Sequence, residues 1–178
     1  MEDEERHRNL RHFQVLYDAH HGALAAYANR RTTPADAQDV VADTFTIAWR
    51  RLPEVPEGDA ALPWLYGVAR RVLANQRRGN QRRTDLTARL RGQGSLSPDV
   101  EGQVLAGDER RRVLVALSRL RPADQEILRL AVWEELPHRD IAGVVGCSES
   151  SVAVRLHRAR TRLGREIGKE ERRVGQET

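Results

Sequence analysis

The stretch PHRDIAGVVGCSESSVAVRLHRARTRL, residues 137–163, places a small residue, a glycine and an apolar residue at a defined spacing. Ala142 lets two helices approach closely, and Gly146, four positions later, suits a sharp turn between them. Val152, ten positions after Ala142, can anchor the second helix against the first. A short helix, a glycine-containing turn and an anchored second helix make up a helix-turn-helix, and this motif is predicted here.

The two predicted helices carry the apolar residues that they need to pack together. Ile141 and Val145 are expected to complete the buried side of the first helix, and Ser148 can cap the second. The apolar residues on the inner face of the second helix recur at steps of four, three and four residues, as an amphipathic helix requires. Its members are Val152, Leu156, Ala159 and Leu163.

The outer face of the second helix is basic. Residues 151–165 contain no acid, and four arginines recur there at helical steps, Arg155, Arg158, Arg162 and Arg165. A helix in the major groove meets base edges near its N-terminus and phosphates further along. We therefore expect DNA contacts from Ser148, Glu149, Ser150, Ser151, Ala153, Val154, Arg155, His157, Arg158 and Arg162. The alternative is an amphipathic hairpin with a solvated basic face, and the combined spacing of the motif favours DNA binding over it.

Further helices are predicted toward the N-terminus. Apolar and aromatic residues recur at helical spacing over residues 13–28. A capping hydroxyl at Thr33 followed by Pro34 predicts the start of a second helix, which spans residues 34–52. A third helix is predicted over residues 63–78, with an apolar side and arginine stripes on the other side.

Helical periodicity stops after Arg78 and returns at Val113. Residues 79–105 are rich in glycine and also hold serine and proline, and they exceed the roughly 12–15 residues usual for a loop inside a compact domain. We predict a flexible linker there, between small domains at 10–78 and 106–168. Because no alternating strand pattern and no internal repeat occur, the expected fold class is all-α, with two small helical domains.

The composition excludes several classes of protein. The 178 residues are 39% apolar and 31% charged, and no apolar run approaches the ~18 residues that cross a bilayer, so no membrane insertion is expected. The N-terminal MEDEERHRN lacks the apolar core of a secretory signal. The lone Cys147 cannot form an internal disulfide, and a packing role is favoured for it over a redox switch. A cytoplasmic protein is expected.

The placement of charge is more informative than its total. The formal net charge is only +4, and every basic residue except Lys169 is arginine, an abundance that GC-rich codons explain. However, residues 64–92 hold eight arginines against the single acid Asp85, and residues 151–165 hold five against none. Two basic clusters in a nearly balanced chain predict an anionic partner that is engaged at two places.

The predicted helices resemble those of a known family. DAQDVVADTFTIAWRRL (36–52) is similar to the helix of sigma factor region 2 that docks on the RNA polymerase clamp, and PWLYGVARRVLANQRR (63–78) resembles the helix that engages the −10 promoter element. The helix-turn-helix half resembles region 4, which reads the −35 element. Two such domains on one linker resemble the extracytoplasmic-function (ECF) group of sigma-70 factors, over about residues 10–168.

This resemblance implies roles for particular residues. Core polymerase would be bound by Asp36, Asp39, Val40, Asp43 and Thr44, although an ordinary solvated face is the alternative for the acids. The −10 element and its melted strand would be bound by Trp64, Arg70, Arg71, Asn75, Arg77, Arg78 and Arg82. The loop at residues 54–62 would offer a pocket for a −10 base.

Some aromatic residues have two possible roles. Trp64 could stack on a base, but it begins a helix that must bury something, and core packing is favoured. Trp49 and Phe45 continue an apolar helical face and are predicted to lie in the core, as is Trp133.

The chain departs from the family pattern at several positions. Arg71 and Asn75 stand where relatives often have Asn and Asp, and Glu135 replaces the usual glycine before the helix-turn-helix, which puts the geometry of that turn in question. Ala153 and Val154 replace polar residues; they can touch thymine methyl groups but donate no hydrogen bond. The −35 sequence preference therefore stays open.

These observations favour an alternative sigma factor that binds the clamp and flap of core RNA polymerase, recognises promoter DNA and assists its melting. An ordinary helix-turn-helix regulator is less well supported, because it leaves the basic segment at residues 63–83 without a role. An enzyme is not expected, since the polar residues form no catalytic constellation, and neither a cofactor nor a metal is expected. By resemblance, an anti-sigma factor is an expected partner.

Overall fold

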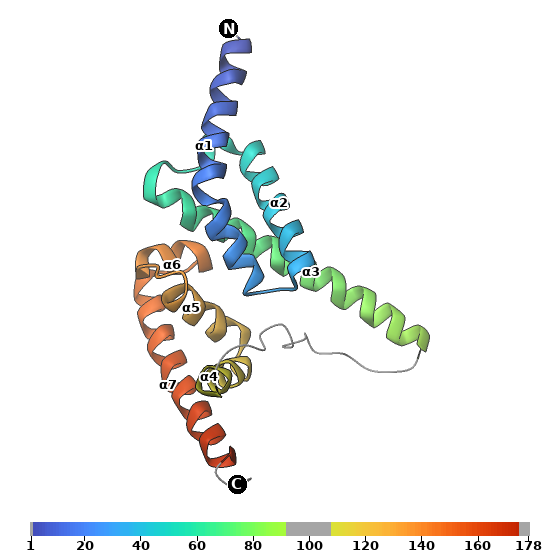
Figure 1. The fold of residues 1–178 in the computed structure, drawn as a ribbon, viewed down its shortest axis with the longest axis vertical. Helices are drawn as coiled ribbons and strands as arrows, with labels where there is room; N and C mark the ends of the chain where they lie inside the picture. The colour runs from blue at the N-terminus through green and yellow to red at the C-terminus, as the bar shows by residue number, and fades with distance from the viewer. Residues whose placement is uncertain (1, 92–107, 175–178) are drawn as a thin grey trace. The chain divides into compact units, whose positions relative to one another are not determined.

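The computed structural model describes residues 2–91 and 108–174, and every regular element within these ranges is a helix (Figure 1). The all-α fold predicted from the sequence is therefore confirmed. The chain divides into two compact units, Met1–Asp99 and Val100–Thr178. None of the described helices is both long and apolar enough to cross a membrane.

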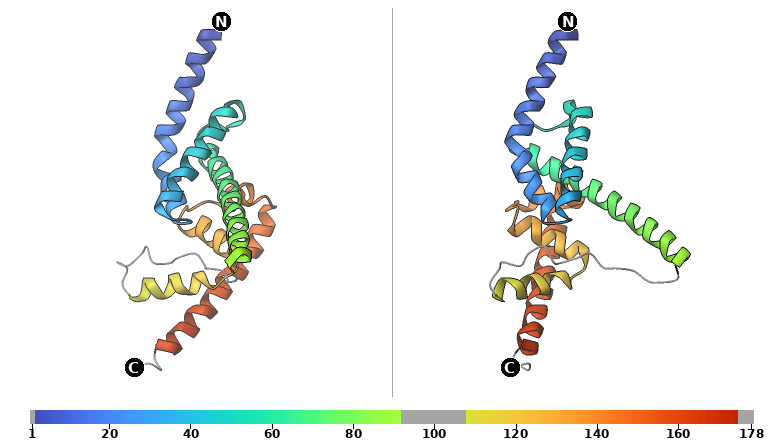
Figure 2. Two further views of the ribbon diagram at one scale, coloured as in Figure 1. Left: turned by 90° about the vertical axis from the view of Figure 1, so that its right-hand side faces the viewer. Right: turned by 45° about the vertical axis from the view of Figure 1, so that its right-hand side comes forward.

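The described part of the first unit contains three α-helices. They are α1 (Glu2–Asn29), α2 (Pro34–Arg50) and α3 (Ala61–Arg91), with the short 3-10 turns η1 (Leu52–Glu54) and η2 (Gly58–Ala60) between the last two. Helix α2 folds back along α1, and α3 packs against both (Figure 2). Their facing sides bury a core that includes Leu16, Leu24, Tyr27, Val40, Val41, Phe45, Leu65, Val68 and Val72.

The start of α2 follows the predicted chemistry. The Thr33 hydroxyl oxygen accepts a hydrogen bond from the Asp36 amide at 3.3 Å, and Pro34 occupies the first turn, where its missing N–H costs nothing. The helix ends at Arg50, just before Pro53, which has no N–H to continue the hydrogen-bond ladder.

Two helices in this unit are longer than the sequence pattern predicts. Helix α1 begins at Glu2, not near Phe13, because the acids of its first turns are favourable at the positive end of a helix dipole. Helix α3 continues to Arg91, which corrects the expectation that residues 79–91 belong to a linker. These residues are mostly good helix formers without proline, so their intrinsic propensity favours a helix. The remaining linker residues, 92–105, lie outside the described part.

A buried arginine fastens the turn between α1 and α2 to α3. The guanidinium of Arg31 lies 3.5 Å from the ring centroid of Tyr27 and donates to the Tyr27 carbonyl at 3.0 Å. Tyr27 stacks in turn on Tyr66 of α3, with centroids 4.6 Å apart. Arg77, also on α3, donates to the Arg31 carbonyl at 3.1 Å. This network sets how α3 sits on the other two helices.

The second unit contains α4 (Asp108–Ser118), α5 (Pro122–Val132), α6 (His138–Val145) and α7 (Glu149–Val174). Helix α7 packs against each of the other three, and α5 also packs against α6 (Figure 1). The shared core includes Ala116, Leu117, Leu120, Ile127, Leu128, Leu130, Ile141, Val144, Val152, Leu156 and Ala159. This core positions the outward face of α7.

Candidate nucleic-acid interface and docking groove

The turn between α6 and α7 has the geometry of a helix-turn-helix. Gly146 adopts the left-handed conformation, with φ 72° and ψ 48°, which residues with a Cβ rarely adopt. Its amide and that of Cys147 both donate to the Ala142 carbonyl, at 2.9 and 3.1 Å. The Ser148 hydroxyl then accepts from the Ser151 amide at 3.3 Å and caps α7. The predicted roles of glycine and serine are confirmed.

The inner face of α7 is buried as predicted at Val152, Leu156 and Ala159, while Leu163 is only partly buried. On α6 the structure differs from the sequence prediction at one position. Val144 is buried and Val145 is partly exposed. Both follow Ile141 within one helical turn, so the apolar period alone does not decide between them.

Most of the predicted DNA contacts lie together on the exposed face of α7 and on its cap. The exposed residues are Ser148, Glu149, Ser150, Ala153, Val154, Arg155, His157, Arg158 and Arg162, and Ser151 is partly exposed. Arg155 and Arg158 form no ion pair with any described residue, so their guanidinium groups remain available to an anion. Arg162 differs, because its Nη1 pairs with the carboxylate of Asp124 on α5.

The turn before the helix-turn-helix keeps the left-handed geometry that the family glycine would allow. Glu135 has φ 52°, and it is the one non-glycine residue with a positive φ in the described part of the chain. The Leu136 amide closes this turn by donating to the Leu130 carbonyl at 3.1 Å. The departure from the family pattern therefore places a residue with a Cβ in a strained backbone conformation.

The basic residues predicted on α3 are divided between two roles. Arg71, Asn75 and Arg78 are exposed, Arg70 is partly exposed, and Arg78 donates to the Asn75 side chain at 2.5 Å. Arg77 is held by the Arg31 carbonyl, so it helps to join α3 to the α1–α2 turn. The side chain of Arg82 lies outside the described residues.

Trp64 is neither fully buried nor free. Its ring is partly exposed at the start of α3, and the Arg51 guanidinium lies 5.8 Å from its centroid. The neighbouring Tyr66 is buried in the core. The loop at residues 54–62 contains η2, where Gly58 has φ 61°.

The predicted polymerase-binding residues of α2 point in two directions. Asp39 and Asp43 are exposed on the outer face. Asp36 is partly buried, and its carboxylate accepts from the Thr33 hydroxyl at 2.9 Å. Val40 and Thr44 are completely buried on the core side of the helix. The prediction that these two residues contact a partner directly is therefore corrected: their side chains pack in the core.

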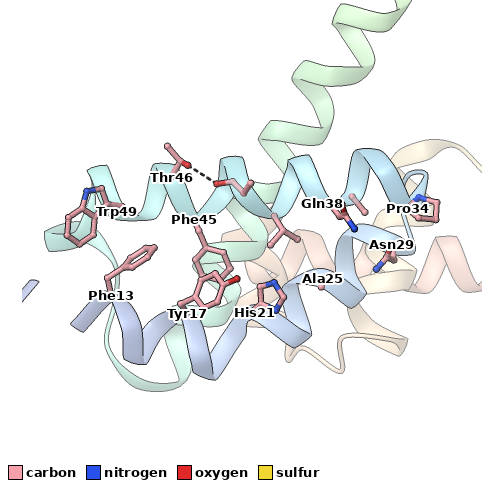
Figure 3. A pocket seen from close by; sticks show the side chains of 13 residues that line it. Phe13, Tyr17, His21, Ala25, Asn29, Pro34, Gln38, Phe45, Thr46 and Trp49 are labelled. Atoms are coloured by element: carbon pink, nitrogen blue, oxygen red, sulfur yellow. Dashed lines mark hydrogen bonds between the residues drawn. The ribbon is translucent and has the colours of Figure 1, made fainter. Parts of the chain in front are cut away.

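An apolar groove of about 910 Å³ lies between α1 and α2 (Figure 3). Tyr17 and Trp49 are 38% and 40% exposed along it, and Phe45 forms its floor. Phe13 packs edge-on against Trp49, with ring centroids 5.2 Å apart. His21 lies beside Tyr17 at 4.8 Å and completes the aromatic row.

The prediction that Trp49 lies in the core is therefore wrong, and Trp133 is also 37% exposed at the end of α5. Trp49 sits in the last turn of α2 and lines the groove, whereas Phe45, one turn earlier, is buried as predicted, and so are Ala48 and Leu52. Trp133 follows α5 as its C-cap, with the Arg129 guanidinium 5.7 Å from its ring.

Sequence reasoning did not identify this groove. The signal was present, because Phe13, Tyr17 and His21 recur every four residues on α1. Such spacing marks an apolar face without saying whether another helix covers it. Among the described residues, no cluster of three or more His, Cys, Asp or Glu is arranged to hold a metal ion. Cys147 is partly exposed in the helix-turn-helix turn.

Comparison with known proteins gives consistent matches to both units. The family model "Sigma-70 region 2" matches residues 16–83, and "Sigma-70, region 4" matches residues 110–163. RNA polymerase sigma factor NccH of Alcaligenes xylosoxydans xylosoxydans is 32% identical over 156 residues, 85% of this chain and 84% of that protein. ECF RNA polymerase sigma factor BldN of Streptomyces coelicolor is 27% identical over 86% of this chain and 59% of that protein.

The fold also has a counterpart among solved structures. The sigma factor RpoE of Bartonella quintana, solved in complex with the anti-sigma factor NepR, superposes with a TM-score of 0.67. It is 24% identical, and the match covers 88% of this chain and 96% of that one. At this identity the likeness describes the fold.

Proposed function

Because the chain belongs to the ECF group of the sigma-70 family of RNA polymerase sigma factors, we propose that it recruits core polymerase to particular promoters. In this proposal it binds −10 and −35 elements, assists promoter melting and acts in the cytoplasm. The observation that carries the proposal is the exposed basic face of α7, presented by a helix-turn-helix within the region 4 match.

Recognition of the −35 element is assigned to the N-terminal half of α7. Ser150, Val154 and His157 are exposed there, where a recognition helix meets base edges. Val154 can contact a thymine methyl group, and His157 and Arg158 can donate hydrogen bonds to bases. Arg155 and Arg158 are also positioned to neutralise phosphates, because neither is engaged by an acid of the described chain.

Recognition of the −10 element is assigned to α3. Arg71 and Arg78 are exposed on one side of this helix, with Asn75 between them, and Arg70 is partly exposed. A cationic surface of this kind suits the backbone of a melted strand. Trp64, partly exposed beside Arg51, is the aromatic ring available for stacking on a base. Arg77 supports this surface through the Arg31 carbonyl.

Binding of the core polymerase clamp is assigned to α2 and the groove beside it. Asp39 and Asp43 supply negative charge, and Tyr17 and Trp49 supply apolar surface. Exposed aromatic side chains next to charged residues are typical of protein–protein interfaces. We assign contact with the flap to the second unit by family resemblance.

An anti-sigma factor is the proposed negative regulator. RpoE of Bartonella quintana and CnrH were both solved in complexes with such partners, NepR and the cytosolic domain of CnrY. The present chain shares their fold, and we extend this mode of control to it.

Reconstitution with core RNA polymerase, followed by mapping of transcript start sites, tests the proposal. The expected result is initiation at a defined set of promoters only when the chain is present. Arg155→Ala combined with Arg158→Ala should reduce −35-dependent initiation and leave core binding intact. Asp39→Arg should weaken core binding and leave the DNA-binding face unchanged.

Failure to bind core polymerase at micromolar concentration would contradict the proposal. A specific footprint of the free chain on duplex DNA, without polymerase, would favour an ordinary helix-turn-helix regulator. Unchanged polymerase affinity in Asp39→Arg would remove the role assigned to α2.

A further inference from the structure

Arg162 belongs by sequence to the basic stripe of α7, but it pairs with a carboxylate on another helix, whereas Arg155 and Arg158 form no ion pair with a described residue. At about 100° per residue, Arg162 lies ~80° from the buried Val152, between Arg155 at ~60° and Arg158 at ~120°. Arg162 is therefore at the edge of the buried face, next to α5. Its side chain remains 43% exposed, so this position does not by itself decide its role.

The partner of Arg162 is a carboxylate that the fold has largely removed from water. Asp124 is only 9% exposed, and its Oδ2 lies 2.5 Å from Arg162 Nη1. It sits in the first turn of α5, after Pro122, where the helix dipole also favours a negative charge. Thirty-eight residues separate the two partners in sequence, so the pair joins two helices that are distant in the chain.

The location of this pair matters for the outward face of α7. Val152, Leu156 and Ala159 hold the first three turns of α7 by apolar burial, which sets the side of the helix that faces the core but, being non-directional, restrains small rotations only weakly. The ion pair follows directly after Ala159 and is directional, so it fixes the rotation of α7 about its own axis. That rotation decides where Val154, His157 and Arg158 point.

We propose that Arg162 and Asp124 are positioning residues, which set the rotation of the recognition helix, and that Arg162 is not a phosphate contact. This inference rests on the proposed recognition of the −35 element by α7. It replaces the direct DNA contact that the arginine spacing predicts for Arg162. Arg158, which is exposed in the third turn of the same helix, serves as the matched phosphate-contact candidate.

The test uses holoenzyme assembled from core polymerase and the full chain, wild type or variant. The probes are a fluorescent duplex that carries a promoter mapped with the wild-type holoenzyme and the same duplex with a scrambled −35 element. Affinities are measured over a series of salt concentrations for Arg162→Ala, Asp124→Ala, the double variant and Arg158→Ala. Circular dichroism at the assay temperature establishes that each chain is folded, and Asp124→Asn substitutes for Asp124→Ala if that variant is not.

The pair predicts a specific pattern of results. Arg162→Ala and Asp124→Ala should weaken binding to the intact promoter by the same factor, between roughly 2-fold and 30-fold, the range for residues that act through packed neighbours. The double variant should lose no more than either single variant, because one interaction is removed in all three. The slope of log affinity against log salt should stay at the wild-type value in these variants, but should become shallower by about 0.9 in Arg158→Ala.

Two results would overturn the inference while leaving the proposed function intact. One is a slope that is shallower by about 0.9 in Arg162→Ala, together with wild-type affinity in Asp124→Ala. The other is a double variant whose loss equals the product of the two single losses. If wild-type holoenzyme does not distinguish the intact promoter from the scrambled one, the proposed −35 recognition fails, and this inference fails with it.

Discussion

Replacing Glu135 with glycine should stabilise the second unit. Glu135 holds a φ of 52°, and an L residue with a Cβ pays about 1–2 kcal/mol there. Its side chain is exposed and makes no ion pair with a described residue, so the substitution removes no contact. Glycine has more freedom in the unfolded chain, which costs about 0.5–1 kcal/mol. The net expectation for Glu135→Gly is a gain of about 0.5–1 kcal/mol in the free energy of unfolding.

Two glycines of the adjoining helix-turn-helix supply matched controls. A Cβ at Gly146 would meet nothing within 4 Å, so Gly146→Ala tests only the cost of φ 72° and should destabilise the unit by about 1 kcal/mol. A Cβ at Gly143 also meets open space, but this residue is inside α6, and Gly143→Ala should stabilise by about 0.5–1 kcal/mol. The same Gly→Ala change is therefore expected to have opposite effects on the free energy of unfolding at two positions three residues apart.

Urea unfolding followed by Trp133 fluorescence measures these differences, since Trp133 is the one tryptophan in the sequence of the second unit. Trp49→Phe and Trp64→Phe, introduced into every chain that is compared, remove the tryptophan fluorescence of the first unit. With a slope of about 1–2 kcal/mol per molar urea, Glu135→Gly should raise the midpoint by about 0.5 M. A midpoint that falls or stays unchanged in Glu135→Gly, while Gly143→Ala raises it, would refute the attribution of strain to the backbone at this turn.

Four further outcomes are expected. Arg155→Ala with Arg158→Ala should lower the salt slope of promoter binding by about 1.8, because two phosphate contacts are lost; an unchanged slope in holoenzyme titrations would remove these residues from the phosphate contacts. Thr33→Ala should cost the first unit about 1 kcal/mol, measured by denaturant unfolding, because it removes the cap of α2, and the neighbouring Thr32→Ala serves as the comparison. Burial lowers the pKa of His20 below its ordinary value of 6.5, so the folded chain binds fewer protons than the unfolded chain and stability falls as pH drops through 6.5. His20→Gln should therefore reduce the difference in stability between pH 7.5 and 5.5, and an identical difference in both chains would show that His20 is not its source. Trp49→Ala should cost more free energy of core polymerase binding than free energy of unfolding, because this ring is 40% exposed. A larger loss in the free energy of unfolding than in that of binding would assign Trp49 to folding alone.

The parts of the structure that depend on neighbouring residues could be predicted from the sequence. The cap at Thr33, the left-handed turn at Gly146 and the cap at Ser148 each follow from one side chain and the backbone within four residues of it. The basic outer face of α7 could also be predicted, because arginines at helical spacing opposite apolar residues can only lie on the outside.

The parts that depend on distant residues could not be predicted. Arg162 has the same spacing as Arg155 and Arg158, and only the fold brings Asp124 to it. Trp49 continues the apolar face of α2, but its ring lines a groove that no described helix covers, and the sequence does not mark which part of the face stays uncovered. The helical course of residues 79–91 was missed for a different reason, because the prediction relied on apolar periodicity, and this segment has none.

The apolar groove between α1 and α2 has a consequence for how long the free chain persists in a cell. Exposed aromatic surface such as Tyr17 and Trp49 promotes aggregation and attracts quality-control factors. Any partner that fills the groove binds only the folded chain, and at a hundred times its dissociation constant it adds about 2.7 kcal/mol of stability. Chain made in excess of its partners is therefore expected to be degraded first. The cellular amount of the chain would then follow the amount of partner available to fill the groove.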